Sequence, residues 1–258
     1  MDVDELVAEF RPRLRGALVA TDFDGTLAPL TRDPEDSRPV EGAVEALAAL
    51  AGLGAAVAVI TGRDAQTVLR LSGLQAVPGL TVAGMYGIET WSAGELTTPD
   101  TPDPITALRE RLPAVLAGGD PDIWIEDKRL SLVVHARRAA DPDAALAEVD
   151  SGVRALAAEL ALEVHPGSQV LELRLPGFDK AAALARLAEG ATAALYLGDD
   201  LGDLPAFDEI SRLRSAGTPA WSVGVLSSGA DGIATAVDVT LADPPATVEL
   251  LARLSGNG

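Results

Sequence analysis

The sequence predicts an α/β fold, in which a doubly wound parallel-sheet core carries an inserted α/β cap domain. Short apolar runs recur along the 258 residues, and several lead into a polar turn followed by a helical pattern. Apolar runs of this kind are typical of strands that are buried on both faces, as in parallel sheets. Between residues 93 and 177 the predicted order of helices and strands changes to αββαββ, which indicates a second and smaller sheet.

The core elements follow in chain order. Apolar residues at helical spacing predict an amphipathic helix within 2–15, and Ser37 followed by Pro39 predicts the start of a helix that continues over 40–53. A helix is also expected after Gly62, and another opens at Lys180. The buried strands of the core are predicted at 17–21, 55–60, 80–84, 193–197, 221–225 and 237–241. A closing helix over 245–254 completes the core, and no chemistry is expected in the last two strands or in this helix.

Turn residues mark both ends of the insertion. Thr, Pro and Asp crowd residues 97–104, and Pro176 with Gly177 follows the last inserted strand. The inserted elements are predicted at 105–116, 123–126, 131–136, 142–160, 162–164 and 170–175. The core is therefore expected at 1–92 and 178–258, and the cap at 93–177. A cap of this size can exclude water from a neighbouring site and contact the leaving group of a substrate.

Composition excludes several classes of function. The chain has no cysteine, which excludes disulfides, thiolate metal sites and a cysteine nucleophile. A net charge of -19 argues against nucleic acid and anionic membranes as partners. The first residues lack the pattern of a signal peptide, and no apolar run approaches the roughly 20 residues of a membrane span. We therefore expect a cytoplasmic location. A monomer is also expected.

The stretch Asp22-Phe23-Asp24-Gly25-Thr26-Leu27 directly follows the first predicted strand. Ligands of open parallel sheets bind at the carboxyl ends of the strands, which is where Asp22 emerges. Carboxylates at i and i+2 suit phosphoryl transfer, because one can attack phosphorus while the other protonates the leaving oxygen. A divalent cation would offset their charge. The alternative is an ordinary polar turn, since Asp and Gly are common turn residues.

A second polar turn, Thr61-Gly62-Arg63, repeats this geometry after the next strand. A hydroxyl followed by a helix N-terminus can bind phosphate oxygens, although Thr61 could also be a simple helix cap. Lys180 is one of only two lysines, with Lys128, and it stands in the first turn of a helix, where the helix dipole opposes a positive charge. Contact with a carboxylate and a phosphate would explain that position, and a solvated surface lysine is the alternative.

Three carboxylates lie within five residues after the strand 193–197, at Asp199, Asp200 and Asp203. Such carboxylates repel one another unless a cation binds among them. Oxygen ligands of this type suit Mg²⁺.

Together these stretches resemble the four motifs of the haloacid-dehalogenase-like (HAD) phosphotransferases: D-x-D-x-T/V, S/T-G-R, D-K-G/A-x-A-L and GDD-x-x-D. Further stretches are similar to the trehalose-6-phosphate phosphatase family. These are Gly84 to Glu89 (G-x-H-G-x-E), 126–135 (E-x-K-x-x-S-x-x-x-H) and 170–174 (V-x-E-I-R). The chain departs from that family in having Tyr86 in place of His, and GDDLGD where the family has GDD-x-T-D.

The resemblance implies hydrolysis of trehalose 6-phosphate with Mg²⁺ as cofactor. Asp22 would be the nucleophile and Asp24 the proton donor, and Thr61 and Lys180 would hold phosphate oxygens. The implied metal site comprises Asp22, Asp24 through its carbonyl oxygen and Asp199, with Asp200 as a second metal contact and Asp203 holding Lys180 or a metal-bound water. The implied substrate contacts are Gly25, Thr26, Gly62, Arg63, Tyr86, Glu89, Glu126, Lys128, His135 and Glu172.

Two alternatives stay open. The core motifs contact only the phosphate, so another capped HAD sugar-phosphate phosphatase fits them equally well. A catalytically silent domain that binds a sugar phosphate is the second alternative, although such a domain would not need the proton donor Asp24.

Overall fold

The computed structural model describes residues 1–98, 100, 102–167, 169–228 and 231–256. The chain divides into two units, Met1–Thr98 with Asp179–Gly258 (unit 1) and Pro99–Phe178 (unit 2). Pro99 and Thr101, which belong to the turn-rich stretch predicted to open the cap, lie outside the described residues.

Unit 1 is built on an eight-stranded sheet with the order β12-β11-β10-β1-β2-β3-β4-β5. Neighbouring strands from β12 to β3 are parallel, while β4 and β5 continue the sheet as an antiparallel hairpin. The strands are β1 Leu18–Thr21, β2 Ala56–Ile60, β3 Thr81–Gly84, β4 Glu89–Ser92, β5 Glu95–Thr97, β10 Ala194–Gly198, β11 Ala220–Val225 and β12 Val239–Leu241.

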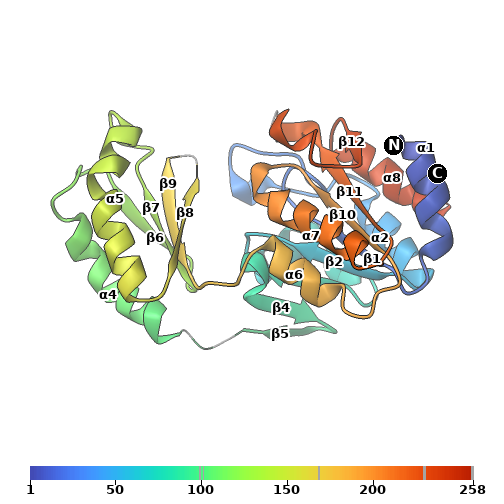
Figure 1. Ribbon diagram of the computed structural model, residues 1–258, viewed down its shortest axis with the longest axis horizontal. Coiled ribbons are helices and arrows are strands. Elements are labelled where there is room, and N and C mark those ends of the chain that lie inside the picture. Colours follow the sequence, from blue (N-terminus) through green and yellow to red (C-terminus); the bar gives the residue numbers. More distant parts are fainter. Residues whose placement is uncertain (99, 101, 168, 229–230, 257–258) are drawn as a thin grey trace. The chain divides into compact units, whose positions relative to one another are not determined.

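The strand order reverses at β1, which pairs with β10 on one side and β2 on the other (Figure 1). Thr21 at the end of β1 is opposite Leu197 of β10 and Val59 of β2. The segments that follow these three strands therefore meet at one edge of the sheet. Ligands of doubly wound folds bind at such a reversal point.

Helices cover both faces of this sheet. One apolar cluster joins one face to α1, α2, α3 and α8, and a second joins the other face to α6 and α7 (Figure 1). Val19 of β1 belongs to the first cluster, whereas Leu18 and Ala20 belong to the second. The apolar run therefore forms a strand that is buried on both faces. The helices are α1 Val3–Phe10, α2 Ala43–Gly52, α3 Ala65–Ser72, α6 Lys180–Leu187, α7 Leu204–Ser215 and α8 Pro244–Ser255.

Unit 2 contains a four-stranded antiparallel sheet with the order β6-β7-β9-β8. Leu132 and Val134 of β7 pack with the helices, so the face of the sheet that α4 and α5 cover carries an apolar core. The elements are α4 Asp103–Leu116, β6 Trp124–Asp127, β7 Ser131–His135, α5 Pro142–Glu159, β8 Glu163–Gly167 and β9 Val170–Arg174. This order is αββαββ and confirms the predicted fold class.

Two local predictions were wrong, and one hairpin was not predicted. The helix expected over 2–15 ends at Phe10 and gives way to a turn of 3-10 helix at Arg11–Arg13, which contains Pro12. The helix expected from Ser37 begins only at Ala43, because Gly42 before it has a positive φ of 88° and so cannot belong to the helix. The β4–β5 hairpin was not predicted, because its strands are short and only partly buried.

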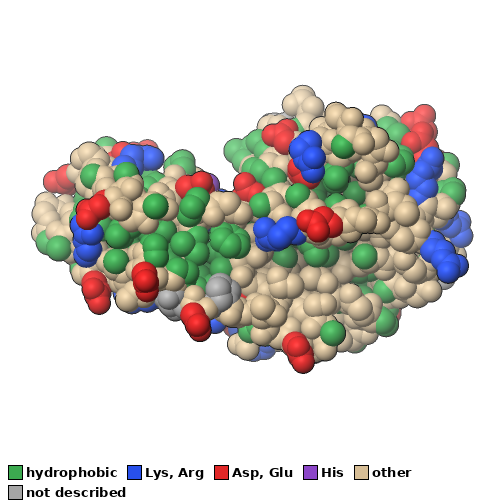
Figure 2. All heavy atoms as spheres, turned by 60° about the horizontal axis from the view of Figure 1, so that its bottom comes forward, with side chains coloured by type: hydrophobic (Ala, Val, Ile, Leu, Met, Phe, Trp, Pro, Cys, Tyr) green, Lys and Arg blue, Asp and Glu red, His purple; other side chains and the backbone are tan. Residues whose placement is uncertain are grey.

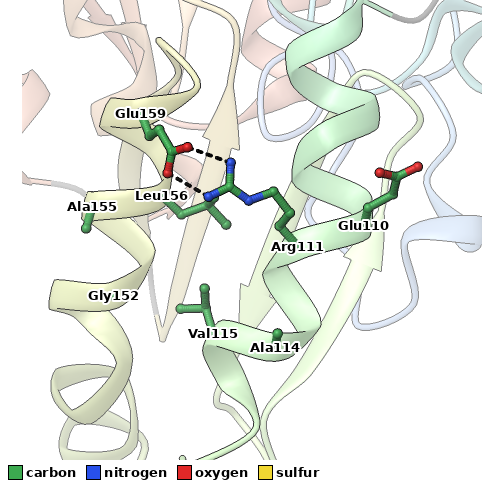
Figure 3. Close-up of a pocket in the computed structure, with 8 residues that line it drawn as sticks. All are labelled: Glu110, Arg111, Ala114, Val115, Gly152, Ala155, Leu156 and Glu159. Carbon is green, nitrogen blue, oxygen red and sulfur yellow. Dashed lines mark hydrogen bonds and ion pairs between the residues drawn. The ribbon is translucent and has the colours of Figure 1, made fainter.

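A pocket of about 530 Å³ lies within unit 2, between α4 and α5 (Figure 3). The ion pair between Arg111 and Glu159 crosses it, with the closest atoms 2.6 Å apart. None of the predicted site residues is among those that line it: Glu110, Arg111, Ala114, Val115, Gly152, Ala155, Leu156 and Glu159.

The surface carries charged side chains of both signs. On the face that Figure 2 shows, Lys and Arg side chains stand in small groups among Asp and Glu side chains. Among the described residues, no helix is both long enough and apolar enough to cross a membrane.

Candidate active site

The side chain of Lys180 joins two carboxylates at the carboxyl end of β1. Its Nζ donates to Asp22 Oδ2 at 2.8 Å and to Asp203 Oδ1 at 2.6 Å, and all three side chains are buried. Asp179 caps the N-terminus of α6, which places Lys180 at the first helical position. Burial raises the pKa of Asp22 even though Lys180 opposes the shift, and the carboxylates around Lys180 outweigh burial and raise its pKa. These shifts favour a charged lysine between the two carboxylates.

The carboxylate of Asp203 accepts hydrogen bonds from four donors in the site. Its Oδ1 accepts from Lys180 and, at 2.5 Å, from the hydroxyl of Tyr196, while Oδ2 accepts the backbone N–H groups of Asp199 and Asp200. A carboxylate offers about four lone-pair sites, so these four donors fill them. Burial opposes ionisation of Asp203, but Lys180 outweighs burial and lowers its pKa. Asp203 is thus better suited to holding its neighbours in place than to direct contact with a metal.

Tyr196 was missed by the sequence analysis. It lies in β10 with its side chain fully buried, and burial raises its pKa, so the hydroxyl stays protonated and donates to Asp203. A polar aromatic residue within an otherwise apolar strand was the available signal.

Asp199 approaches the turn after β1 closely. A Cβ on Gly25 would lie 2.0 Å from Asp199 Oδ2, and Gly25 also has a positive φ of 75°, so only glycine fits there. Ser227, in the segment after β11, donates to the Gly25 carbonyl at 2.7 Å and lies 3.3 Å from Asp199 Oδ2. The sequence analysis assigned no role to the segment after β11, so Ser227 is a residue bordering the site that it did not identify.

The acidic cluster can hold a metal ion. One carboxylate oxygen from each of Asp22, Asp199 and Asp203 lies within 4.8 Å of the others, and all three side chains are buried. Burial, together with the neighbouring Asp200 and Asp203, raises the pKa of Asp199 to about 7. A cation would relieve this repulsion, and hard oxygen ligands suit Mg²⁺. Since Asp203 is already saturated by donors, Asp22 and Asp199 are the side chains that fit direct contact.

Asp200 has a different place. Its Oδ1 accepts the N–H of Gly202 at 2.8 Å, and its side chain caps the short 3-10 helix Leu201–Asp203. It is exposed and is not part of the metal-compatible cluster of buried carboxylates.

Asp24 follows Asp22 by two residues and is partly exposed. Its carboxylate accepts hydrogen bonds from Ser37 and from Arg63. The predicted substrate contact Arg63 is therefore engaged with the predicted proton donor.

The turn after β2 packs against the segment after β3. Thr61 is buried and its Oγ accepts the N–H of Arg63 at 3.1 Å. The ring of Tyr86 covers Gly62 so closely that a Cβ there would lie 2.8 Å from the tyrosine hydroxyl oxygen. Glu89 is buried and accepts the N–H of Ala65 at 2.7 Å, so it stabilises the start of α3.

Thr26, in the turn after β1, is buried, and its Oγ has no partner among the described residues.

The remaining predicted contacts lie in unit 2. His135 Nε2 is 2.8 Å from Glu126 Oε2, and Glu172 accepts from the Ser131 hydroxyl at 2.8 Å. Cross-strand pairing places these side chains on the sheet face opposite α4 and α5. Lys128 is half-buried in the β6–β7 turn, where its backbone N–H donates to the Ser131 carbonyl. This face also carries Trp124, which stacks on His135, and the buried Val133; we call it the polar sheet face of unit 2.

Comparisons with known proteins agree with this geometry. The sequence model of the family "Trehalose-phosphatase" matches residues 20–235. The trehalose-phosphate phosphatase of Mycobacterium avium is 35% identical over 93% of this chain and 62% of its own length. The chain spans about three fifths of the length of the curated relatives it matches.

Solved structures support the same assignment. A crystal structure of Aspergillus fumigatus trehalose-6-phosphate phosphatase covers 100% of this chain and 98% of its own, with a TM-score of 0.77 and 26% identity. A haloacid dehalogenase-like hydrolase from Bacteroides thetaiotaomicron, 17% identical with a TM-score of 0.67 over 92% of this chain and 98% of its own, shares the fold. With its paired carboxylates at the strand reversal and its αββαββ insertion, the chain belongs to the trehalose-phosphatase family.

Proposed function

We propose that this chain is a Mg²⁺-dependent phosphatase that hydrolyses trehalose 6-phosphate to trehalose and phosphate. The observation that carries the proposal is Asp22, which is buried at the end of β1 and paired with Lys180 at 2.8 Å. Asp24 lies two residues further on, and Asp199 comes from the neighbouring strand end. The printed names of the relatives support the choice of substrate.

In the first step, an oxygen of Asp22 forms a bond to phosphorus while the bond between phosphorus and the sugar oxygen breaks. The electron pair of that bond goes to the sugar oxygen, which takes a proton from Asp24. Lys180 holds the Asp22 carboxylate in place and can also contact a phosphate oxygen. The Thr61 hydroxyl and the N–H groups of the following turn would bind the other phosphate oxygens.

In the second step, water attacks the phosphorus of the aspartyl-phosphate and gives a proton to Asp24. The bond between phosphorus and Asp22 then breaks, which releases phosphate and restores the carboxylate. Asp24 thus serves as acid in one step and as base in the next.

Mg²⁺ would be held by the Asp22 and Asp199 carboxylates and by the carbonyl oxygen of Asp24. When bound, it would offset the charge of the carboxylates and of the phosphate. The approach of Asp199 to Gly25 and the pKa of about 7 for Asp199 support a cation at this place.

We also propose that unit 2 is the cap and that its polar sheet face binds the sugar. Glu126, His135 and Glu172 lie on this face, and carboxylates and imidazoles are suitable partners for sugar hydroxyls. Lys128 would add a positive charge beside them.

A second candidate is another sugar-phosphate phosphatase with the same core. Tyr86 favours this alternative, because it stands where the family usually has His and its ring covers Gly62 of the predicted phosphate site. A tyrosine can donate a hydrogen bond but carries no positive charge near neutral pH.

Phosphate release from a panel of sugar phosphates, with Mg²⁺ and with a chelator, tests these proposals. We expect a strong preference for trehalose 6-phosphate, with activity lost in chelator and in Asp22→Asn. Asp150→Asn, on the exposed side of α5, is the matched control and should remain active. A different preferred sugar would contradict the assignment of unit 2, and metal-dependent release by Asp22→Asn would contradict the nucleophile.

A further inference from the structure

The carboxylate of Asp24 is held by three donors from two other segments of unit 1. Ser37 Oγ donates to Oδ1 at 2.8 Å, and Arg63 donates to Oδ1 through Nη2 at 2.7 Å and to Oδ2 through Nε at 2.5 Å. The two arginine contacts form a fork that fixes both the position and the plane of a carboxylate. Asp24 therefore has little freedom to turn.

Arg63 is itself fixed at several points. Its Nη1 donates to the Pro34 carbonyl at 2.8 Å, and its guanidinium carbon lies 5.8 Å from the centre of the Phe23 ring. Its backbone N–H contacts Thr61 Oγ, and its carbonyl accepts the N–H of Met85 at 2.8 Å. Asp24 therefore already occupies the Nε–Nη2 edge of the guanidinium, and Nη1 on the other edge donates to the Pro34 carbonyl.

Helix capping does not explain why Ser37 is buried where it is. It is completely buried although its neighbours in the loop are polar, and α2 begins six residues later with Gly42 as its cap. Asp33 accepts the N–H of Glu35 and starts a turn of 3-10 helix over Pro34–Asp36. This turn places the Ser37 hydroxyl at Asp24 and the Pro34 carbonyl at Arg63.

We propose that Ser37 and Arg63 are positioning residues for Asp24, and that Arg63 acts through Asp24 instead of binding the substrate. Together they hold the Asp24 side chain where its protonated form can give a proton to the leaving oxygen. This inference rests on the proposed function, since it assumes that Asp24 is the proton donor. The inference predicts an effect on the rate that depends on the leaving group, because positioning of the proton donor matters only for leaving groups that need a proton.

The test compares two substrates with Mg²⁺ present. Trehalose 6-phosphate has an alcohol leaving group that needs a proton, whereas the phenolate of p-nitrophenyl phosphate departs without one. The variants are Ser37→Ala and Arg63→Lys, with Asp24→Asn as the reference for complete loss of the donor. Thr31→Val and Arg70→Lys are matched controls, because Thr31 contacts the Asp33 carbonyl and Arg70 pairs with Glu35 in the same loop without touching Asp24.

We expect Ser37→Ala and Arg63→Lys to lose about tenfold more kcat/KM on trehalose 6-phosphate than on p-nitrophenyl phosphate, a part of the effect of a complete general acid. The loss should fall on kcat more than on KM, and the two controls should show no such difference. Equal losses on both substrates would overturn the inference, because they would indicate phosphate binding or a folding defect. Unchanged activity in both variants would overturn it as well.

Asp24→Asn separates this inference from the proposed function. If it shows the difference between substrates and the two positioning variants do not, the inference fails while the proposed function stands. If Asp24→Asn itself shows no difference, the assignment of Asp24 as proton donor is wrong, and the inference falls with it.

Discussion

Replacement of Lys180 by Met should destabilise unit 1 strongly in the absence of metal. Lys180 is 5% exposed and donates to two carboxylates, one of which, Asp203, is completely buried. Hydrogen bonds to charged groups contribute about 1.5–3 kcal/mol each. Removal of one partner from a buried ion pair costs about 3–5 kcal/mol, because an uncompensated charge remains. We therefore expect Lys180→Met to lower the free energy of unfolding by about 3–5 kcal/mol.

The measurement is urea unfolding followed by tryptophan fluorescence in chelator, in a Trp124→Phe background. Of the three tryptophans, Trp91 and Trp221 belong to unit 1 and Trp124 to unit 2, so the remaining signal reports on unit 1. Arg70→Met is the matched control, because the ion pair of Arg70 with Glu35 lies in unit 1, is exposed and should contribute little.

Two results test whether uncompensated buried charge causes the loss of stability. The double variant Lys180→Met/Asp22→Asn should recover part of the loss, because one of the two unpaired charges is then removed. A loss of less than about 1 kcal/mol in Lys180→Met would refute the reasoning, since it would place the lysine among exposed, screened pairs.

Two further predictions concern the metal and Tyr196. Burial raises the pKa of Asp199 to about 7 in the folded protein, whereas the usual value in an unfolded chain is about 4. The contribution of Asp199 to the free energy of unfolding is therefore fully present below about pH 4 and is lost as the pH rises through about 7. Mg²⁺ favours the ionised form, so the increase in melting temperature that it causes should grow between about pH 5.5 and 8, and a constant increase in a thermal-shift assay would contradict this. Tyr196→Phe removes one donor to the buried Asp203 and should lower the free energy of unfolding by about 1–3 kcal/mol in urea titrations, whereas an unchanged midpoint would show that Asp203 does not need it.

The residues that carry the proposed chemistry could be predicted because they follow buried strands. Asp22, Thr61 and Asp199 each come directly after an apolar run, and the carboxyl ends of parallel strands meet at one edge of a sheet. The position of Lys180 was equally informative, because a lysine at a helix start is unfavourable without a partner.

Other features depend on contacts that local patterns do not contain. Ser37 follows a turn signal and was expected to start a helix, but its hydroxyl contacts Asp24, 13 residues earlier in the chain. The expected role of Arg63 as a substrate contact takes no account of its fork on Asp24, 39 residues away. Ser227 reaches Gly25 across 202 residues and gave no signal in the sequence.

The sequence by itself determined the α/β class, the αββαββ insertion and the identity of the acidic and basic residues, because apolar periodicity and residue chemistry are local properties. Only the tertiary structure decided which donors each carboxylate receives. The strand order places β10 beside β1, so that Lys180 can join Asp22 to Asp203 and Tyr196 can hold Asp203 from the strand. Pairing across 158 residues follows from packing of the whole sheet, and no single stretch of the chain encodes it.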